Sequence, residues 1–286
     1  EHLDAVDGRD QMDLIADLAF PLPFAVISEM LGMPEGDTAQ LRDWSHTLVK
    51  ILDFTIGPDE LMAAVVAGEN LREYIAEVIA WKRSNLGDDL LSALILAEDD
   101  GDVLSDTELL DQVNVLFIAG HETTVNLIGN GTWALLCNRD QFELLRDDPS
   151  VEATAIDELL RYDSPVQLSR RITLEPIELA GHAVPAGVFV LTSLGSANRD
   201  PAVFGPTADQ LDLRRVDAAR HLAFGSGTHH CLGASLARLE GTIAITRLIR
   251  RFPDLEAIGG PAWNGRLVLR GMDELQLALN PGGGAR

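Results

Sequence analysis

The segment from residue 105 to residue 138, SDTELLDQVNVLFIAGHETTVNLIGNGTWALLCN, constrains the fold more than any other stretch of the chain. Ser105 and Glu108 have the spacing of a capping box, which predicts that a helix begins there. The segment then stays apolar for many turns and on nearly every face. A helix of this kind usually runs through the middle of a protein, so we expect a central helix over 105–137 with the other elements packed around it.

The other segments before Pro165 are expected to be mostly helical, and the segments after it a mixture of short strands and one helix. Apolar spacing predicts helices within 36–52, 60–83, 88–101 and 149–163, and another from about Gly233 to Arg251. After Pro165, β-branched alternation and Gly/Pro turns predict short strands and hairpins over 170–194, and 266–280 is strand-like. The tail 281–286 is expected to be flexible. We therefore predict a mainly α fold with a small β portion, as a single domain over 1–286.

Composition excludes several classes of protein. No apolar run is long enough to cross a bilayer, and no secretory signal pattern is present, so a cytoplasmic location is expected. Two cysteines, Cys137 and Cys231, cannot build a disulfide framework. A formal charge of −23 opposes binding to nucleic acid or to an anionic membrane.

The first residues indicate a start inside a longer protein. The chain opens without an initiator Met, and Leu3, Val6, Leu14 and Ile15 already follow a periodic pattern. We expect an N-terminal segment to be lacking.

The stretch FGSGTHHCLG, residues 224–233, places one thiol between a glycine-rich turn and an expected helix. Taken alone, it leaves several interpretations open. A phosphate loop lacks its Lys, a zinc site lacks further ligands, and a Cys–His nucleophile lacks an orienting partner. A tight turn with a buried Cys is a purely structural alternative.

A thiolate bound to haem iron is the interpretation that uses most of these residues. Free N–H groups at a helix N-terminus favour thiolate at Cys231. Gly225, Gly227 and Gly233 would let backbone approach a flat macrocycle. Phe224 can pack on the ring, and His229 can reach a carboxylate at its edge.

Three motifs together resemble those of the cytochrome P-450 monooxygenases. FGSGTHHCLGASLARLE resembles the haem-binding motif of that family, AGHETT (119–124) its oxygen-binding stretch, and ELLR (158–161) its Glu-x-x-Arg pair. The order of the motifs is that of soluble bacterial members, and the resemblance extends over nearly the whole chain. It implies a P-450-like fold, incomplete at the N-terminus, that binds haem b (iron protoporphyrin IX).

The resemblance also implies roles for individual residues. Cys231 would be the metal ligand, and Thr123 and Glu122 a relay that delivers protons to bound dioxygen. Glu158, Arg161 and Arg215 would brace the structure. The further haem-binding residues would be Phe224, Gly225, Gly227, His229, Gly233, Arg171, Ala119 and Gly120, and the substrate pocket would be lined by Ile118, Ala119, Val166 and Leu168 under a roof formed by 44–66.

The implied activity is insertion of one oxygen atom from O2 into an apolar small molecule. Electrons would come from an acidic ferredoxin-type partner, because 214–251 carries seven Arg against Asp217 and Glu240 in an otherwise acidic chain. Two alternatives are a truncated or degenerate relative that binds haem without turnover and a helical interaction protein without a cofactor.

Overall fold

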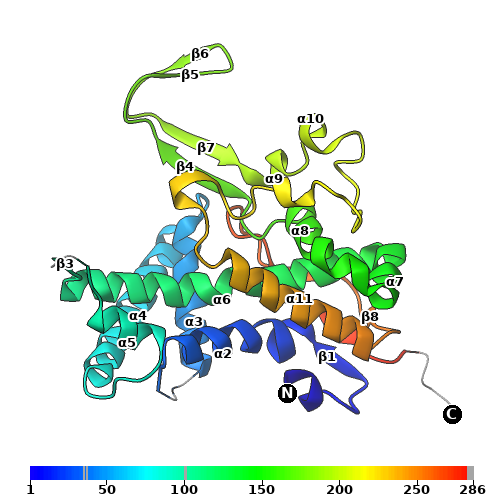
Figure 1. The fold of residues 1–286 in the computed structure, drawn as a ribbon, viewed down its shortest axis with the longest axis horizontal. Helices are drawn as coiled ribbons and strands as arrows, with labels where there is room; N and C mark the ends of the chain where they lie inside the picture. The colour runs from blue at the N-terminus through cyan, green and yellow to red at the C-terminus, as the bar shows by residue number, and fades with distance from the viewer. Residues whose placement is uncertain (35, 37, 100–101, 282–286) are drawn as a thin grey trace.

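A single long helix, α6 (Asp106–Cys137), runs through the middle of the molecule (Figure 1). The computed structural model describes residues 1–34, 36, 38–99 and 102–281. The Ser105 hydroxyl accepts from the Glu108 amide, and the Glu108 carboxylate accepts from the Ser105 amide. The expected capping box is therefore confirmed. Most side chains in the second half of α6 are buried, among them His121, Glu122 and Asn130.

The predicted helices are present, with small changes in their ends. The helices are α1 (His2–Ala5), α2 (Pro21–Met30), α3 (Thr38–Leu48), α4 (Pro58–Lys82), α5 (Leu90–Leu96), α6, α7 (Arg139–Asp147), α8 (Glu152–Tyr162), α9 (Leu194–Ala197), α10 (Pro201–Phe204) and α11 (Ala234–Arg251). Short π or 3-10 turns are η1 (Ile15–Ala19), η2 (Val49–Leu52), η3 (Pro149–Val151), η4 (Ala218–Arg220) and η5 (Gly227–His229). Sequence reasoning treated 1–35 only as a periodic apolar pattern, without assigning α2.

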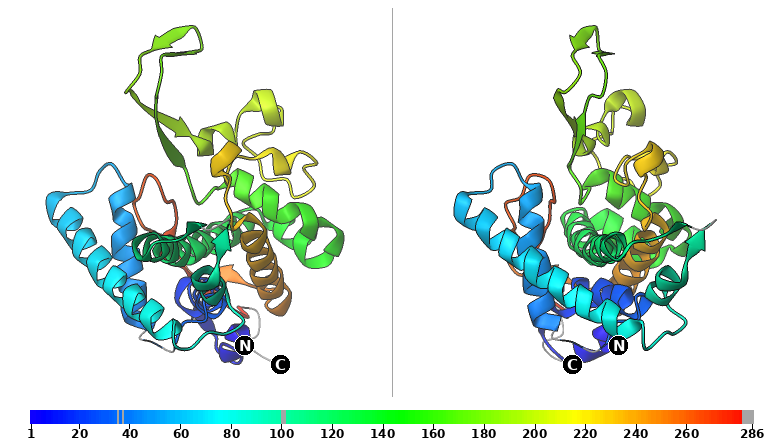
Figure 2. Two further views of the ribbon diagram at one scale, coloured as in Figure 1. Left: turned by 60° about the vertical axis from the view of Figure 1, so that its left-hand side comes forward. Right: turned by 90° about the vertical axis from the view of Figure 1, so that its left-hand side faces the viewer.

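Helices on several sides cover α6. α2 and α4 pack on one part of it, and α8 and α11 on another (Figures 1 and 2). Close approach is possible because two glycines lie at the contacts: a Cβ on Gly131 would lie 3.0 Å from Ile245 of α11. A Cβ on Gly241 would lie 2.7 Å from Ile156 of α8 and 2.9 Å from Leu127 of α6. Real Cβ atoms rarely tolerate such distances, so these glycines set how near α11 lies to its neighbours.

The strands are β1 (Gln11–Asp13), β2 (Glu98–Asp99), β3 (Asp102–Val103), β4 (Leu168–Ile172), β5 (Ile177–Leu179), β6 (His182–Val184), β7 (Phe189–Ser193), β8 (Glu256–Ala257), β9 (Ala262–Trp263), β10 (Met272–Glu274) and β11 (Gln276–Ala278). β4 pairs antiparallel with β7, and β5 with β6, so the predicted hairpins are confirmed. Together they project from the helical body (Figure 1).

A three-stranded sheet joins the two ends of the described chain. Its order is β1-β11-β8, all antiparallel, with Met12 opposite Leu277. The sequence did not predict β1, because its three residues are held by a partner more than 260 positions away. The predicted flexible tail 281–286 lies outside the described residues from 282 onward. No helix in the described part of the chain is long and apolar enough to cross a membrane.

A buried ion network ties α8 to the irregular segment before α11. Arg161 is fully buried and donates through Nε and Nη2 to Glu158 at 2.6 and 2.8 Å. Its remaining N–H groups donate to the carbonyls of Asn198 (2.8 Å) and Ala208 (2.6 Å). Arg215 joins from the other side, with Nε 3.2 Å from the Glu158 carboxylate. The structure thus brings together the three residues for which a bracing role was inferred.

Removing the shared carboxylate should destabilise the fold strongly. Glu158→Gln leaves two buried arginines facing each other without a counter-charge, so we expect a loss of about 3–5 kcal/mol in the free energy of unfolding. Chemical denaturation of the variant measures it. Asp147→Asn, which removes the exposed carboxylate that pairs with Arg146, is the control and should change little. A small effect of Glu158→Gln would contradict the bracing role.

Candidate active site

The loop before α11 presents the Cys231 thiol at the end of a helix. Gly225 and Gly227 have φ of +69° and +73°, a backbone conformation that favours glycine. The Cys231 amide donates to the Phe224 carbonyl at 2.9 Å and closes the loop. Cys231 is exposed, and α11 begins three residues later. The glycines at 225 and 227 are therefore explained by the turn itself.

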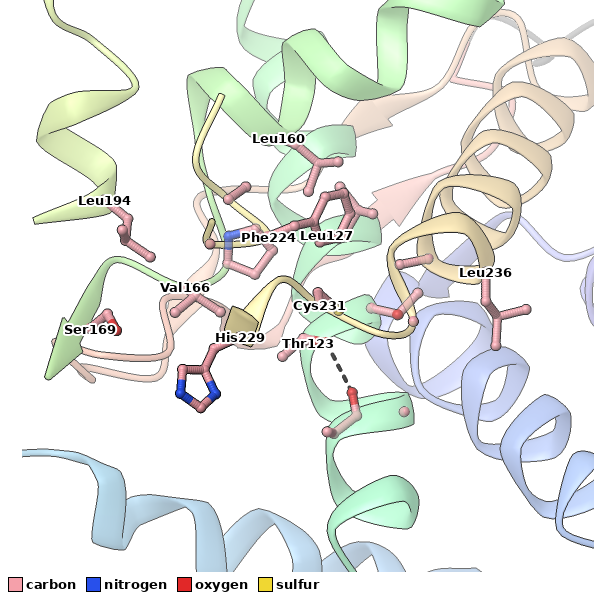
Figure 3. Close-up of a pocket in the computed structure, with 18 of the residues that line it drawn as sticks. Thr123, Leu127, Leu160, Val166, Ser169, Leu194, Phe224, His229, Cys231 and Leu236 are labelled. Carbon is pink, nitrogen blue, oxygen red and sulfur yellow. Dashed lines mark hydrogen bonds between the residues drawn. The ribbon is translucent and has the colours of Figure 1, made fainter. Parts of the chain in front are cut away.

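The thiol faces a cavity of about 470 Å³ between α6 and α11 (Figure 3). The cavity collects residues from five separate segments of the chain, and its lining is mostly apolar. Of the inferred site residues it is lined by Ala119, Gly120, Thr123, Val166, Leu168, Arg171, Phe224, Gly225, His229, Cys231 and Gly233. Three inferred residues, Ile118, Glu122 and Gly227, do not line it. Ile118 packs beside it, against the small cluster of Val49, Val268 and Leu269.

Sequence reasoning missed about half of the lining. The missed residues are Thr124, Leu127, Leu160, Pro165, Ser169, Leu194, Ala223, Leu236, Ala237 and Glu240. Helical periodicity could have found several of them. Thr124 and Leu127 continue the face of Ala119–Thr123 on α6, and Leu236, Ala237 and Glu240 continue the face of Gly233 on α11.

Thr123 makes the hydrogen bond that its position predicts. Its hydroxyl donates to the carbonyl of Ala119 at 3.1 Å, the bond marked by the dashed line in Figure 3. The bond does not interrupt the helix, because α6 is continuous through this turn. Gly120 is explained by packing: a Cβ there would lie 2.8 Å from the Ile27 side chain of α2.

Glu122 lies on another face of α6 from Thr123. It lines a separate cavity of about 260 Å³ and accepts a hydrogen bond from Ser45 of α3 at 3.1 Å. Burial raises the pKa of Glu122, but the neighbouring His121 and the charges of His46 and Arg266 outweigh it, so the pKa lies below its usual value. The two residues inferred as one relay are thus adjacent in sequence but open into different cavities.

Arg171, and not its neighbour Arg170, reaches the main cavity. The two alternate across β4. Arg171 lines the cavity and donates to the Ser169 hydroxyl at 2.6 Å. Arg170 instead lies over the ring of Phe54 and donates to the Leu52 carbonyl.

The cavity fits the cofactor that was inferred. It has apolar walls from α6 and α11, one soft sulfur ligand, and two basic side chains, Arg171 and His229, at its lining. Those features suit a large flat ring with a metal centre and acidic edge groups. The zinc alternative lacks support within the described residues, where no cluster of three or more His, Cys, Asp or Glu side chains could hold a metal ion.

Glu240 is an unusual member of the lining. It is only 5% exposed, and neither carboxylate oxygen has a hydrogen-bond partner among the described residues. Burial raises its pKa to about 7, against a smaller opposing effect of the Thr124 hydroxyl. At a pH near 7, about half of the Glu240 carboxyl groups would therefore be protonated and uncharged.

Comparisons with known proteins agree with these features. The family model for Cytochrome P450 matches residues 37–256. A "Cytochrome P450" of Bacillus subtilis is 44% identical over 281 residues, 97% of this chain and 67% of the relative. The monooxygenase PikC of Streptomyces venezuelae is 44% identical over 285 residues, 98% of this chain and 66% of PikC. The chain spans about two thirds of the length of these relatives.

Solved structures agree as well. A crystal structure of a P-450 in complex with acyl carrier protein ligated to hexadec-9Z-enoic acid superimposes with a TM-score of 0.92 at 38% identity, covering 98% of this chain and 72% of that one. The structure of the polyketide-synthase P-450 PksS gives a TM-score of 0.89 at 39% identity, covering 98% and 71%.

The raised pKa of Glu240 should make stability depend on pH. The folded pKa of about 7 lies above the usual 4.5, so the stabilising effect of the neutral acid is complete below pH 4.5 and is lost as pH rises to about 7. The loss amounts to roughly 3 kcal/mol of unfolding free energy. Glu240→Gln should remove this loss.

Chemical denaturation of wild type and Glu240→Gln at pH 4.5 and pH 8 measures the difference. The exposed Glu178→Gln, on the hairpin, is the control. Parallel pH profiles for wild type and Glu240→Gln would contradict the prediction.

Proposed function

The chain belongs to the cytochrome P-450 family, and we propose that the protein is a haem-thiolate monooxygenase that inserts one oxygen atom from O2 into an apolar small molecule. One observation carries the proposal: Cys231 from the start of α11 and Thr123 from the middle of α6 face the same apolar cavity. A thiol alone would suit many proteins. A thiol opposite a hydroxyl-bearing turn of a buried helix suits oxygen chemistry between the two.

We assign Cys231 as the ligand of the haem iron. Bound haem supplies dioxygen activation, and a thiolate ligand increases the electron density that favours O–O cleavage. The start of α11, three residues beyond Cys231, would favour the negative charge of an iron-bound sulfur, because free amides and the helix dipole attract anions. Phe224 and Gly233 line the cavity beside Cys231, so Phe224 would pack against the ring and Gly233 would leave the start of α11 without a side chain there.

We assign the edge of the cofactor to Arg171 and His229. Both line the cavity and carry N–H donors suited to carboxylates. The Arg171 guanidinium is held at the cavity by its hydrogen bond to Ser169, which also lines it. Ala119 and Gly120 belong to the wall formed by α6, where the small side chain of Ala119 would leave room for the ring. Gly227 contributes the turn that presents His229 and Cys231.

The apolar substrate would lie against Ala119, Val166 and Leu168. Val166 and Leu168 also pack on Val49, Val268 and Leu269 together with Ile118, so one continuous apolar surface runs from α6 to η2. Since η2 belongs to the segment 44–66, this supports the roof inferred for the pocket. Apolar walls favour an apolar ligand through burial of surface.

Thr123 would hold a proton for delivery into the cavity. Its hydroxyl donates to the Ala119 carbonyl, so its oxygen lone pairs remain available to accept from water or a bound group. Glu122, one residue earlier, would supply protons from the other side of α6. The helix is thus the wall between the proton source and the reaction space.

Loss of the Thr123 hydroxyl should uncouple turnover. In Thr123→Ala we expect product formation to fall about tenfold, the effect of one lost hydrogen bond of about 1.4 kcal/mol, while O2 consumption continues and hydrogen peroxide is released. Product, peroxide and O2 are measured together. Thr123→Ser is the matched control and should restore coupling.

A carbon monoxide difference spectrum tests the proposal directly. The reduced, haem-loaded protein should give the Soret band of a thiolate-ligated complex, and Cys231→His should move it to the position typical of an imidazole ligand. Failure of the wild-type protein to take up haem would overturn the assignment.

We further propose an acidic electron carrier as partner, bound near the Cys231 loop. Of the seven arginines in 214–251, Arg215 is buried with Glu158. Four more are paired with acidic side chains: Arg214, Arg238, Arg250 and Arg251. Their charge is therefore less concentrated than the sequence suggests. Arg220, exposed at the end of η4 and without an ion pair among the described residues, keeps its charge close to the loop.

Arg220→Glu should slow reduction by the carrier by about tenfold at low salt, with a weaker dependence on ionic strength, because charge steering is lost. Arg247→Glu is the control: Arg247 is also exposed but lies roughly 20 Å along α11 from its start. Stopped-flow reduction of both variants measures the effect. Equal rates for the two variants would contradict docking at the loop.

A further inference from the structure

A polar passage leads from the surface to Glu122. The cavity that Glu122 lines has a volume of about 260 Å³, and a second cavity of about 170 Å³ lies beside it. Both are lined by His46, Asn264, Arg266 and Asp273, so they meet at these side chains. The loop 264–271 lies here between α3 and α6 (Figure 2). Polar cavities of this size hold several water molecules.

The inner end of the passage is a buried polar cluster. Glu122 is 7% exposed, and Ser45 and His121 are fully buried beside it. The Ser45 hydroxyl lies 3.0 Å from His121 Nε2 and 3.1 Å from Glu122 Oε1. His121 Nδ1 lies 2.7 Å from the Phe117 carbonyl, which can only accept, so Nδ1 carries a proton. The ring is thus held in one orientation, edge-on to three phenylalanines.

At the junction of the two cavities, His46 stands between an arginine and a carboxylate. Its Nε2 is 2.8 Å from Arg266 Nη2 and 3.5 Å from Asp273 Oδ1. Arginine can only donate, so Nε2 must be unprotonated while this bond exists. A proton on Nε2 would break the bond to Arg266 and point instead at Asp273. The two arrangements exclude each other.

We propose that His46 and Arg266 form the proton entry to Glu122, with His46 exchanging its Nε2 partner between Arg266 and Asp273 as it takes up and releases a proton. The inference rests on the proposed function, since Glu122 is the proton source on the far side of α6. His46 acts here as a relay and Arg266 as a positioning residue. His46 and Arg266 are thus the residues through which protons would reach Glu122.

The proton count is balanced. Bulk water gives one proton to His46, which becomes an imidazolium paired with Asp273 and frees the Arg266 guanidinium from the ring. The imidazolium passes the proton through water in the inner cavity to the Glu122 carboxylate and returns to the Arg266-bonded state. The net result is transfer of one proton from bulk water to the Glu122 carboxylate.

The surroundings make His46 the group suited to this exchange. Burial lowers the pKa of His46, and Arg266 adds to that effect, so the neutral ring dominates at neutral pH and reprotonation is transient. Asp53 is occupied by the amides of Leu267 and Val268, which pin the loop. The other charged or titratable groups around the passage are Arg42, Asp43, Lys50, Glu60, His121 and Asp273.

One test needs no haem. The titration of the Glu122 carboxyl is followed by infrared spectroscopy, with Glu122→Gln identifying its band. Arg266→Gln should raise the midpoint by about one pH unit, because a nearby positive charge is lost. Arg266→Lys keeps the positive charge, so its midpoint should lie close to that of the wild-type protein. An unchanged midpoint in a folded Arg266→Gln protein would overturn the role of Arg266.

A second test follows turnover in the haem-loaded protein. His46→Gln can still accept from Arg266 but cannot carry a proton, so we expect a larger solvent isotope effect and about fivefold more peroxide per product. His182→Gln, on the exposed hairpin, is the control. Unchanged values, with a normal carbon monoxide spectrum, would overturn the entry route while leaving the monooxygenase assignment intact. A missing carbon monoxide band would instead overturn the proposed function.

Discussion

Burial of α6 on nearly all of its sides is the constraint on which the rest of the structure depends. A helix of 32 residues that packs against α2, α4, α8 and α11 leaves little contact with solvent in its second half. Polar side chains there must find partners or face a cavity. Thr123 lines the apolar cavity and Glu122 lines a polar one on another face, so the helix separates the two spaces.

Two buried glutamates, Glu158 and Glu240, differ in whether their surroundings favour the charged or the neutral carboxyl group. Glu158 is fully buried but receives two arginines and the amide of Asp212, which suits a permanent charge. Glu240 is almost as buried and receives no hydrogen bond within the described residues, which suits a neutral acid. Glu158 holds the segment that leads to Cys231, while Glu240 lies in the wall of the cavity. Environment, and not residue identity, decides which one carries charge.

Helix α3 has a larger part in the site than its place outside the main cavity suggests. Ser45 touches Glu122 and His121, while His46 meets Arg266 from the loop after β9. Helix α3, whose last residues belong to the segment 44–66 inferred as the pocket roof, therefore also contacts the acid on the far face of α6. Any movement of α3 would alter the surroundings of Glu122.

The sequence by itself determined the central helix, most of the surrounding helices, the hairpins within 170–194 and the motif around Cys231. These depend on local patterns: a capping box, 3.6-residue periodicity and glycine-rich turns. Only the tertiary structure decided that β1 pairs with β11, that Arg171 and not Arg170 lines the cavity, and that Glu122 opens away from Thr123. Those outcomes depend on which distant segment packs against a given face, and a periodic pattern records that a face is buried without recording its partner.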